Sequence, residues 1–134
     1  MVRRGMIVLD THAWLWWCDD PSRLSLRARA AIADATQLGV SAISCFELTA
    51  LVARGRLDLD PDAATWIADA LADPATVSLP VDADIAIAGA RLPRDDFPGD
   101  PADRMIFATA RVHGIPLVTK DGALRAFDPR GTVW

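Results

Sequence analysis

Short apolar segments alternate with longer amphipathic segments along this 134-residue chain. The first apolar segment, MIVLD at residues 6–10, is followed at once by the helix-like sequence THAWLWW. Strands that alternate with helices pack best as a mostly parallel sheet with helices on both faces. We therefore expect one α/β domain over residues 1–134, with strands in residues 6–10, 38–44, 75–81, 115–121 and, as an edge strand, 131–134.

The segments between these strands carry the spacing and the start signals of helices. Residues 60–73 begin with Asp60 as the expected N-cap and Pro61 as the first helical residue. A second Asp–Pro pair opens residues 100–114, after a Pro- and Asp-rich loop at 93–100. Further helices are expected in residues 11–17, 21–35, 44–55, 82–92 and 122–127.

Composition excludes several classes of protein. No apolar run approaches the roughly 18 residues needed to cross a bilayer, and the apolar part of MVRRGMIVLD is too short for a signal peptide. We therefore expect a cytoplasmic protein that has no membrane partner. Cys18 and Cys45 lack paired ligand spacing, so we expect core thiols rather than a disulfide or a zinc site. The net charge of −4 argues against a wholly basic nucleic-acid-binding surface and suits a basic protein partner.

Carboxyl side chains follow the expected strands and open one helix. Asp10 ends the first strand, Asp121 ends the fourth, and Glu47 lies one helical turn after the second. Asp100 and Asp103 open the helix at residues 100–114. In a parallel sheet the carboxyl ends of the strands meet at one edge, where ligands bind. Carboxylates gathered there would repel one another, and Mg²⁺ or Mn²⁺ would relieve the repulsion and support hydrolysis of a phosphodiester.

Each acid also has a purely structural interpretation. Asp10, Asp100 and Asp121 could simply cap the helices that follow them. Ser44 and Glu47 match a capping box. The chain has 17 Asp, one Glu and no Asn, so Asp must do the capping that Asn would share elsewhere. Caps need not converge, however, whereas a parallel sheet brings these strand ends together.

Four blocks of the sequence resemble a known family. VLDTHAWLWW, SAISCFEL, DPADRMIFATA and PLVTKDGAL are similar, in order and spacing, to the blocks of PIN-domain nucleases. They resemble in particular the VapC toxins of bacterial VapBC toxin–antitoxin pairs, from about residue 6 to residue 128. The resemblance implies a three-layer α/β/α sandwich with a mostly parallel central sheet and an acidic pocket. It also implies a Mg²⁺- or Mn²⁺-dependent endoribonuclease.

The resemblance implies roles for individual residues. Asp10, Glu47, Asp103 and Asp121 match the family's catalytic acids and metal ligands. Asp100 is additional to the family pattern, and is either an alternative ligand or a residue that supports the ligands. Hydroxyl groups that would orient carboxylates or water belong to Thr11, Ser44 and Thr119.

Several basic residues are candidates for contacts with the substrate. Arg104 and Lys120 lie beside the acids in the sequence and could bind phosphate, or could pair with those acids instead. A cationic face of the helix expected at residues 21–35 is either solvated surface or an RNA contact, and comprises Arg23, Arg27 and Arg29. His12 could approach the site, although a core or capping role fits it as well.

The resemblance further implies an RNA substrate and a cognate VapB-like antitoxin with an apolar and basic tail. A homodimer and a toxin–antitoxin hetero-oligomer are expected on the same ground. The short helix at residues 11–17 contains Trp14, Trp16 and Trp17. These three side chains cannot all face the core, so we expect at least one of them at an interface.

Other functions remain open from the residues. A structure-specific DNA nuclease could use the same acids, and a PIN-like scaffold without catalysis could bind RNA or protein. A receiver-type signalling domain fits least, because its central strand should end in a phosphoacceptor Asp. The second expected strand here offers Ala and Ser instead.

Overall fold

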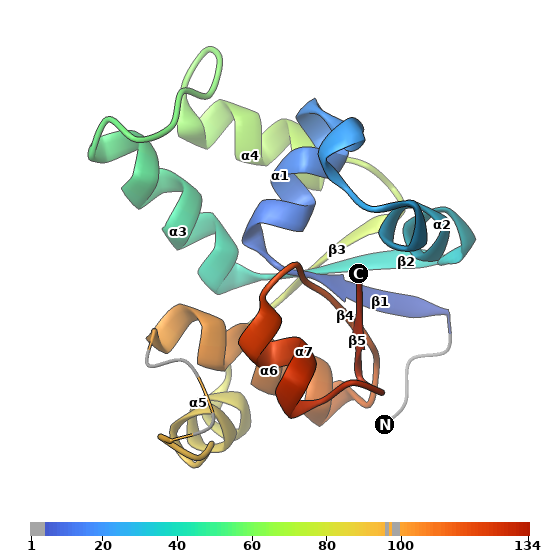
Figure 1. Ribbon diagram of the computed structural model, residues 1–134. Helices are drawn as coiled ribbons and strands as arrows, with labels where there is room; N and C mark the ends of the chain where they lie inside the picture. Colours follow the sequence, from blue (N-terminus) through green and yellow to red (C-terminus); the bar gives the residue numbers. More distant parts are fainter. Residues whose placement is uncertain (1–4, 96, 98–99) are drawn as a thin grey trace.

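Five parallel strands form one sheet in the computed structural model, which describes residues 5–95, 97 and 100–134 (Figure 1). The strand order is β3-β2-β1-β4-β5, and every neighbouring pair is parallel. The strands are β1 Met6–Leu9, β2 Gln37–Ser41, β3 Thr76–Leu79, β4 Leu117–Val118 and β5 Thr132–Val133. The α/β class is therefore confirmed, and the last strand lies at the edge as expected.

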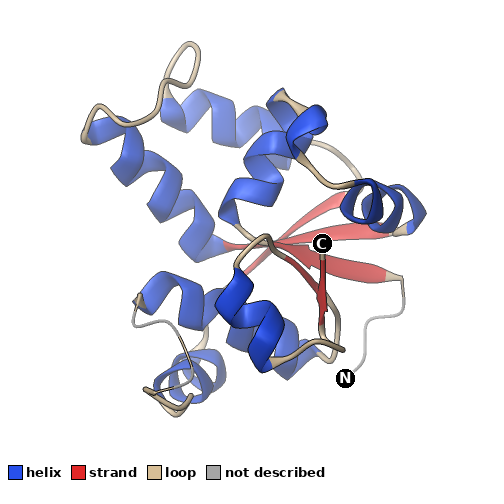
Figure 2. Cartoon of the chain, in the orientation of Figure 1, coloured by secondary structure: helices blue, strands red, loops and turns tan. Residues whose placement is uncertain are grey.

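Helices cover both faces of this sheet, α1 to α4 on one side and α5 to α7 on the other (Figure 2). Their bounds are α1 Thr11–Asp19, the 3-10 helix η1 Pro21–Arg23, α2 Leu26–Asp34, α3 Ala42–Ala53, α4 Ala63–Leu71, α5 Ala83–Ala90, α6 Pro101–His113 and α7 Gly122–Phe127. Within the described ranges, no helix is long and apolar enough to cross a membrane. The loop expected at residues 93–100 includes residues 96, 98 and 99, which lie outside the described residues.

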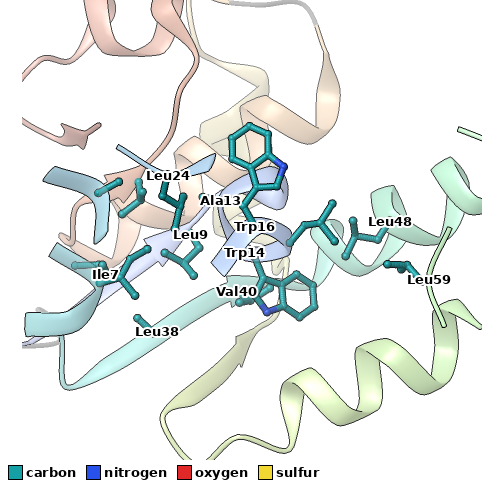
Figure 3. Close-up of a cluster of buried hydrophobic side chains, with 14 of the residues drawn as sticks. Ile7, Leu9, Ala13, Trp14, Trp16, Leu24, Leu38, Val40, Leu48 and Leu59 are labelled. Atoms are coloured by element: carbon teal, nitrogen blue, oxygen red, sulfur yellow. The ribbon is translucent and has the colours of Figure 1, made fainter. Parts of the chain in front are cut away.

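The central strand β1 is buried on both faces, which explains why its sequence is a continuous apolar run. Ile7 and Leu9 point into the layer beneath α1 to α4, while Met6 and Val8 point into the opposite layer. The first layer also holds Trp14, which is 1 % exposed and lies near Val40 in the close-up (Figure 3). Burial on both sides fixes the place at which β1 ends and the chain turns into α1.

The Trp and Cys side chains of α1 and α3 follow the expectations in part. Trp14 and Trp16 are both buried, and the two indoles leave α1 on different sides (Figure 3). Trp17 is only half-buried, and its contact with a partner stays a prediction. The expectation of a core thiol is wrong for Cys18, which is exposed, whereas Cys45 is half-buried and packs against the core.

Helix α3 begins two residues earlier than predicted. The Ser41 hydroxyl accepts a hydrogen bond from the backbone N–H of Ile43 at 3.3 Å and caps the helix. Ser44 consequently lies inside the first turn, so the proposed capping box of Ser44 and Glu47 is wrong. The shift places Ser44 and Glu47 about one turn apart on the side of α3 that faces the protein.

Helix α4 begins later than predicted. The Asp62 carboxylate accepts hydrogen bonds from the Thr65 N–H at 2.8 Å and from the Thr65 hydroxyl at 3.2 Å. Asp62, rather than Asp60, is therefore the N-cap, and Pro61 precedes the helix after a cis Asp60–Pro61 peptide bond.

The helix predicted over residues 21–35 is divided in two. Its first part is the short helix η1, and α2 starts afresh where the Ser25 hydroxyl accepts a hydrogen bond from the Ala28 N–H at 3.0 Å. The division separates Arg23 from Arg27 and Arg29, so the single cationic face expected from the sequence does not form.

Arg104 ties α6 to the C-terminal end of α5. Its guanidinium donates hydrogen bonds to the carbonyls of Leu92 at 2.9 Å, Gly89 at 3.2 Å and Pro93 at 3.4 Å. The same group lies over the Phe97 ring, 5.5 Å from its centroid. Carbonyls at a helix C-terminus lack partners within the helix, so Arg104 supplies the donors that they need.

Replacing Arg104 with Lys tests this tie. Lys keeps the positive charge but lacks the planar fork that serves several carbonyls at once. We expect Arg104→Lys to lower the free energy of unfolding by about 1–3 kcal/mol, seen as a lower urea midpoint at unchanged slope. Arg94→Lys is the matched control, because Arg94 is exposed and forms none of these bonds. Equal midpoints for the two variants would contradict this role.

Candidate active site

The five acids selected from the sequence lie around the carboxyl end of the sheet. Asp10 directly follows β1, and Asp121 follows β4. Glu47 projects from α3, the helix that starts where β2 ends, and Asp100 and Asp103 lie at the start of α6. Electrostatic interactions link the set, because the charges of the other four acids all act on Asp103. The topology thus brings together residues separated by more than a hundred positions in the sequence.

Three of these acids also cap helices. Each accepts hydrogen bonds at 2.8–3.1 Å from backbone N–H groups of the following first turn: Asp10 before α1, Asp100 before α6 and Asp121 before α7. In each case the acceptor is Oδ1, which leaves Oδ2 for another donor or a ligand. The capping role and a role in a site are therefore compatible, since the cap fixes the carboxylate at the end of the strand.

Thr119 positions two of the acids at once. Its side chain is fully buried, and its hydroxyl interacts with the Asp10 carboxylate. The Thr119 oxygen also accepts a hydrogen bond from the backbone N–H of Asp121 at 3.1 Å. Burial raises the pKa of Asp10, the Thr119 and Ala13 hydrogen bonds lower it in part, and the charge of Asp121 raises it. Thr119 therefore stabilises a carboxylate that its surroundings otherwise disfavour.

Glu47 accepts a hydrogen bond from the buried hydroxyl of Thr11, which in turn contacts the buried hydroxyl of Ser44. The Thr11 Oγ1 lies 2.5 Å from Glu47 Oε1 and 2.9 Å from the Ser44 oxygen. Thr11 has one proton to give, and a charged carboxylate is the stronger acceptor. Ser44 can in turn donate to the Thr11 oxygen. Burial still raises the pKa of Glu47, and the charges of Asp100 and Asp10 add to that effect.

Asp103 is the half-buried acid on which the charges of all the other acids act. Burial, followed by the charges of Asp100, Glu47, Asp121 and Asp10, raises the pKa of Asp103 to about 7. Within residues 5–95, 97 and 100–134, no donor hydrogen-bonds to its carboxylate. Asp100, in contrast, is exposed and occupied as the α6 cap. The half-buried Asp103 carboxylate is therefore the one most in need of a positive partner.

The acids do not yet enclose a ligand. As they are placed, no group of three or more His, Cys, Asp or Glu side chains in the described part of the chain could hold a metal ion. The donor set nevertheless has the chemistry that Mg²⁺ or Mn²⁺ prefers, because every member is a carboxylate oxygen. Asp10, Glu47, Asp103 and Asp121 are the residues that would hold such a cation.

Of the basic residues beside the acids, Arg104 is already occupied by the carbonyls at the end of α5. Lys120 is exposed, and its Nζ lies 5.9 Å from the centroid of the Trp16 ring. His12 is exposed, which excludes the core role among those left open for it, and its ring lies 5.7 Å from the Trp16 ring. The charge of His12 lowers the pKa of both Asp10 and Glu47, which places the imidazole beside the acids.

Sequence reasoning missed the part that Trp16 plays here. From the sequence it was only one of three Trp residues of which at least one was expected at an interface, whereas its ring lies near basic side chains from other elements. No spacing in the sequence signals this, because the contacts depend on how η1 and the segment after β4 pack beside α1.

Two solved structures share the fold. A toxin–antitoxin complex from Klebsiella pneumoniae matches with a TM-score of 0.65 and 21% identity, over 96% of both chains. Mycobacterium tuberculosis VapC20, described as a sarcin–ricin loop cleaving toxin, matches with a TM-score of 0.65 and 22% identity, over 91% of this chain and 95% of that one. At these identities the comparison shows a common fold.

The sequence comparisons go further. Ribonuclease VapC22 of Mycobacterium tuberculosis (strain ATCC 25618 / H37Rv) is 43% identical over 130 residues, which cover 96% of this chain and 98% of that protein. The family model for the PIN domain matches residues 7–128, nearly the span of the resemblance drawn from the four sequence blocks. The chain, with its acids around the carboxyl end of a parallel sheet, therefore belongs to the PIN domain family.

Proposed function

We propose that this protein is a metal-dependent endoribonuclease and the toxin of a VapBC-type toxin–antitoxin pair. The observation that carries the proposal is the set of acids whose charges converge on Asp103 at the carboxyl end of the sheet. The 43% identity to a ribonuclease over almost the whole chain supports the RNA substrate. Similarity to a toxin–antitoxin complex supports the toxin role and an antitoxin partner.

Asp10, Glu47, Asp103 and Asp121 would hold the cation, which we propose to be Mg²⁺ or Mn²⁺. We favour Asp103 over Asp100 as the ligand on α6, because Asp103 is half-buried and lacks a donor, whereas Asp100 is exposed and caps the helix. When bound, such a cation would polarise the scissile phosphate and lower the pKa of an attacking water.

The chain's own side chains perform the remaining tasks. The Thr119 hydrogen bond lowers the pKa of Asp10 against the effect of burial, and the Thr119 oxygen accepts from the Asp121 N–H and so positions Asp121. Thr11 holds the Glu47 carboxylate in one orientation. The Asp103 carboxyl, with a pKa near neutrality, retains its proton most readily without a cation and releases it when a positive charge arrives.

The partner would bind the surface beside these acids. Phe46, one residue before Glu47 on α3, is 68% exposed and offers an apolar anchor. The net charge of −4 favours a segment that combines basic and apolar residues. A VapB-like antitoxin tail has this chemistry, and a homodimer of the toxin remains part of the proposal.

Cleavage of total bacterial RNA by the antitoxin-free protein is the first test. We expect discrete fragments in Mg²⁺ and intact RNA in EDTA. Asp10→Asn and Asp103→Asn should each reduce the rate by about 100-fold or more, because each removes a charged ligand. Asp62→Asn is the matched control, since Asp62 caps α4 and is not one of the five acids. Intact RNA in every lane would favour a binding module, and preferential cutting of branched DNA would favour a DNA nuclease.

The raised pKa of Asp103 makes a second prediction, about stability without divalent cations. The folded pKa of about 7 exceeds the ordinary value of 3.8, so the folded state binds the proton more tightly. The free energy of unfolding should therefore fall as the pH rises from about 4 to about 7, and Asp103→Asn should flatten that fall. Thermal unfolding midpoints measured in EDTA across this range check it. An equally steep fall in Asp103→Asn and in the Asp62→Asn control would rule out Asp103 as its source.

Addition of Mg²⁺ at a pH above 7 should raise the unfolding midpoint of the wild-type protein. A ligand that binds only the folded state stabilises it by mass action. Asp103→Asn should gain less at the same Mg²⁺ concentration, because it offers one fewer charged oxygen. Equal gains in Asp103→Asn and wild type would remove Asp103 from the ligand set.

A further inference from the structure

Two positively charged side chains from distant parts of the chain lie near the ring of Trp16. The Cζ of Arg23, on η1, lies 4.6 Å from the centroid of this ring. The Nζ of Lys120, in the segment between β4 and α7, lies 5.9 Å from the same centroid. A third residue, Trp134, packs against this indole at 6.0 Å and completes its surroundings. The ring therefore fixes the positions of an Arg and a Lys that are 97 residues apart.

Both charged groups keep their hydrogen-bonding capacity. Arg23 and Lys120 are exposed, and in the described part of the chain neither side chain forms a hydrogen bond or an ion pair. This is unexpected in a protein with 18 acidic residues. An indole face attracts a cation without occupying its N–H groups. The arrangement therefore presents oriented donors that another molecule can use.

Lys120 connects this pair of cations to the candidate active site through the backbone. Lys120 directly precedes Asp121 and directly follows Thr119, which contacts Asp10. His12 provides a second connection, because its ring lies 5.7 Å from Trp16 and its charge acts on both Asp10 and Glu47. Arg104, in contrast, is occupied by the carbonyls at the end of α5. Trp16 and its two cations therefore lie on the side of the acids formed by α1, η1 and the segment after β4.

We propose that Arg23 and Lys120, held on Trp16, form a phosphate-binding subsite for the RNA strand beside the cleavage site. The inference deepens the proposed ribonuclease function and rests on it. An acidic rim repels a polyanion, so a strand that approaches it needs cations next to the rim. The Arg23 fork can bind two phosphate oxygens, and Lys120 supplies a point charge. Because Trp16 orders both side chains beforehand, less conformational entropy is lost when RNA binds.

Binding of a fluorescently labelled single-stranded oligoribonucleotide tests the subsite. All proteins carry Asp103→Asn, so that the RNA stays intact in Mg²⁺, and intactness is verified on a gel. Arg23→Gln and Lys120→Gln should each weaken binding by about 3- to 10-fold. Each should also reduce the slope of log K against log salt by about 0.7, the value for one phosphate contact on a single strand. Arg27→Gln is the matched control, since Arg27 is exposed, loses the same charge and does not contact Trp16.

Trp16→Phe separates positioning from charge. Phe keeps a ring in the buried position but attracts cations less strongly than Trp. The Trp16→Phe substitution leaves the net charge of the protein unchanged. If RNA binding depended on total charge alone, this variant would bind RNA as tightly as the protein with Trp16. We expect instead a loss of about 2- to 5-fold with normal thermal unfolding. The Trp16→Phe loss should become smaller in the Arg23→Gln, Lys120→Gln background, because the ring then has nothing to orient.

Four results would overturn the subsite, and one of them would also overturn the function on which it rests. Binding by Arg23→Gln and Lys120→Gln that equals binding by Arg27→Gln would show that only total charge matters. Unchanged RNA binding with weaker antitoxin binding would assign the cations to a protein partner. If the Asp103→Asn protein without further substitutions does not bind RNA, and the wild type does not cleave it, the proposed function itself is wrong. Cleavage by wild type at a kcat/KM that neither substitution lowers would remove the subsite alone.

Discussion

The position of β1 constrains everything that lies at the edge of the sheet. Because the strand is covered on both faces, the chain can present polar side chains only after the strand ends. It does so immediately, with Asp10 and then Thr11. The neighbouring strands β2 and β4 run parallel, so their ends bring in α3 and the segment that holds Thr119. Buried hydroxyl groups then connect what the strands deliver, and the acids are positioned by the core rather than by a loop.

Repulsion is the energetic consequence of this arrangement. Burial and neighbouring charges raise the pKa values of Asp10, Glu47 and Asp103. Hydroxyl donors offset the effect at Asp10 and Glu47 but not at Asp103. The site is therefore incomplete without a positive charge. The acids would bind the proposed metal cation, whereas Arg23 and Lys120 on Trp16 would bind phosphates of the RNA. The two groups would therefore contact different parts of one substrate complex.

The sequence was sufficient to predict the strands, their parallel arrangement and the acids at their ends. Apolar runs and the polar residues that bound them are local signals. It was less informative about where helices begin. Ser41 and Ser44, or Asp60 and Asp62, are equally good caps by residue type, and only the packing of the helix decides between them. The role of Arg104 could not be predicted from the sequence either, because it depends on carbonyls at the end of another helix.

The capping bonds at the starts of α1, α6 and α7 connect folding to chemistry. At Asp10 and Asp121 one carboxylate oxygen caps the helix, and the other would bind the proposed cation. Loss of selection for catalysis would remove the need for charge but leave the need for a cap. Degenerate descendants of this chain should accordingly drift toward Asn or Ser at these two positions, and more rarely toward Ala. Their sequences would keep the outline of a nuclease after the activity had gone.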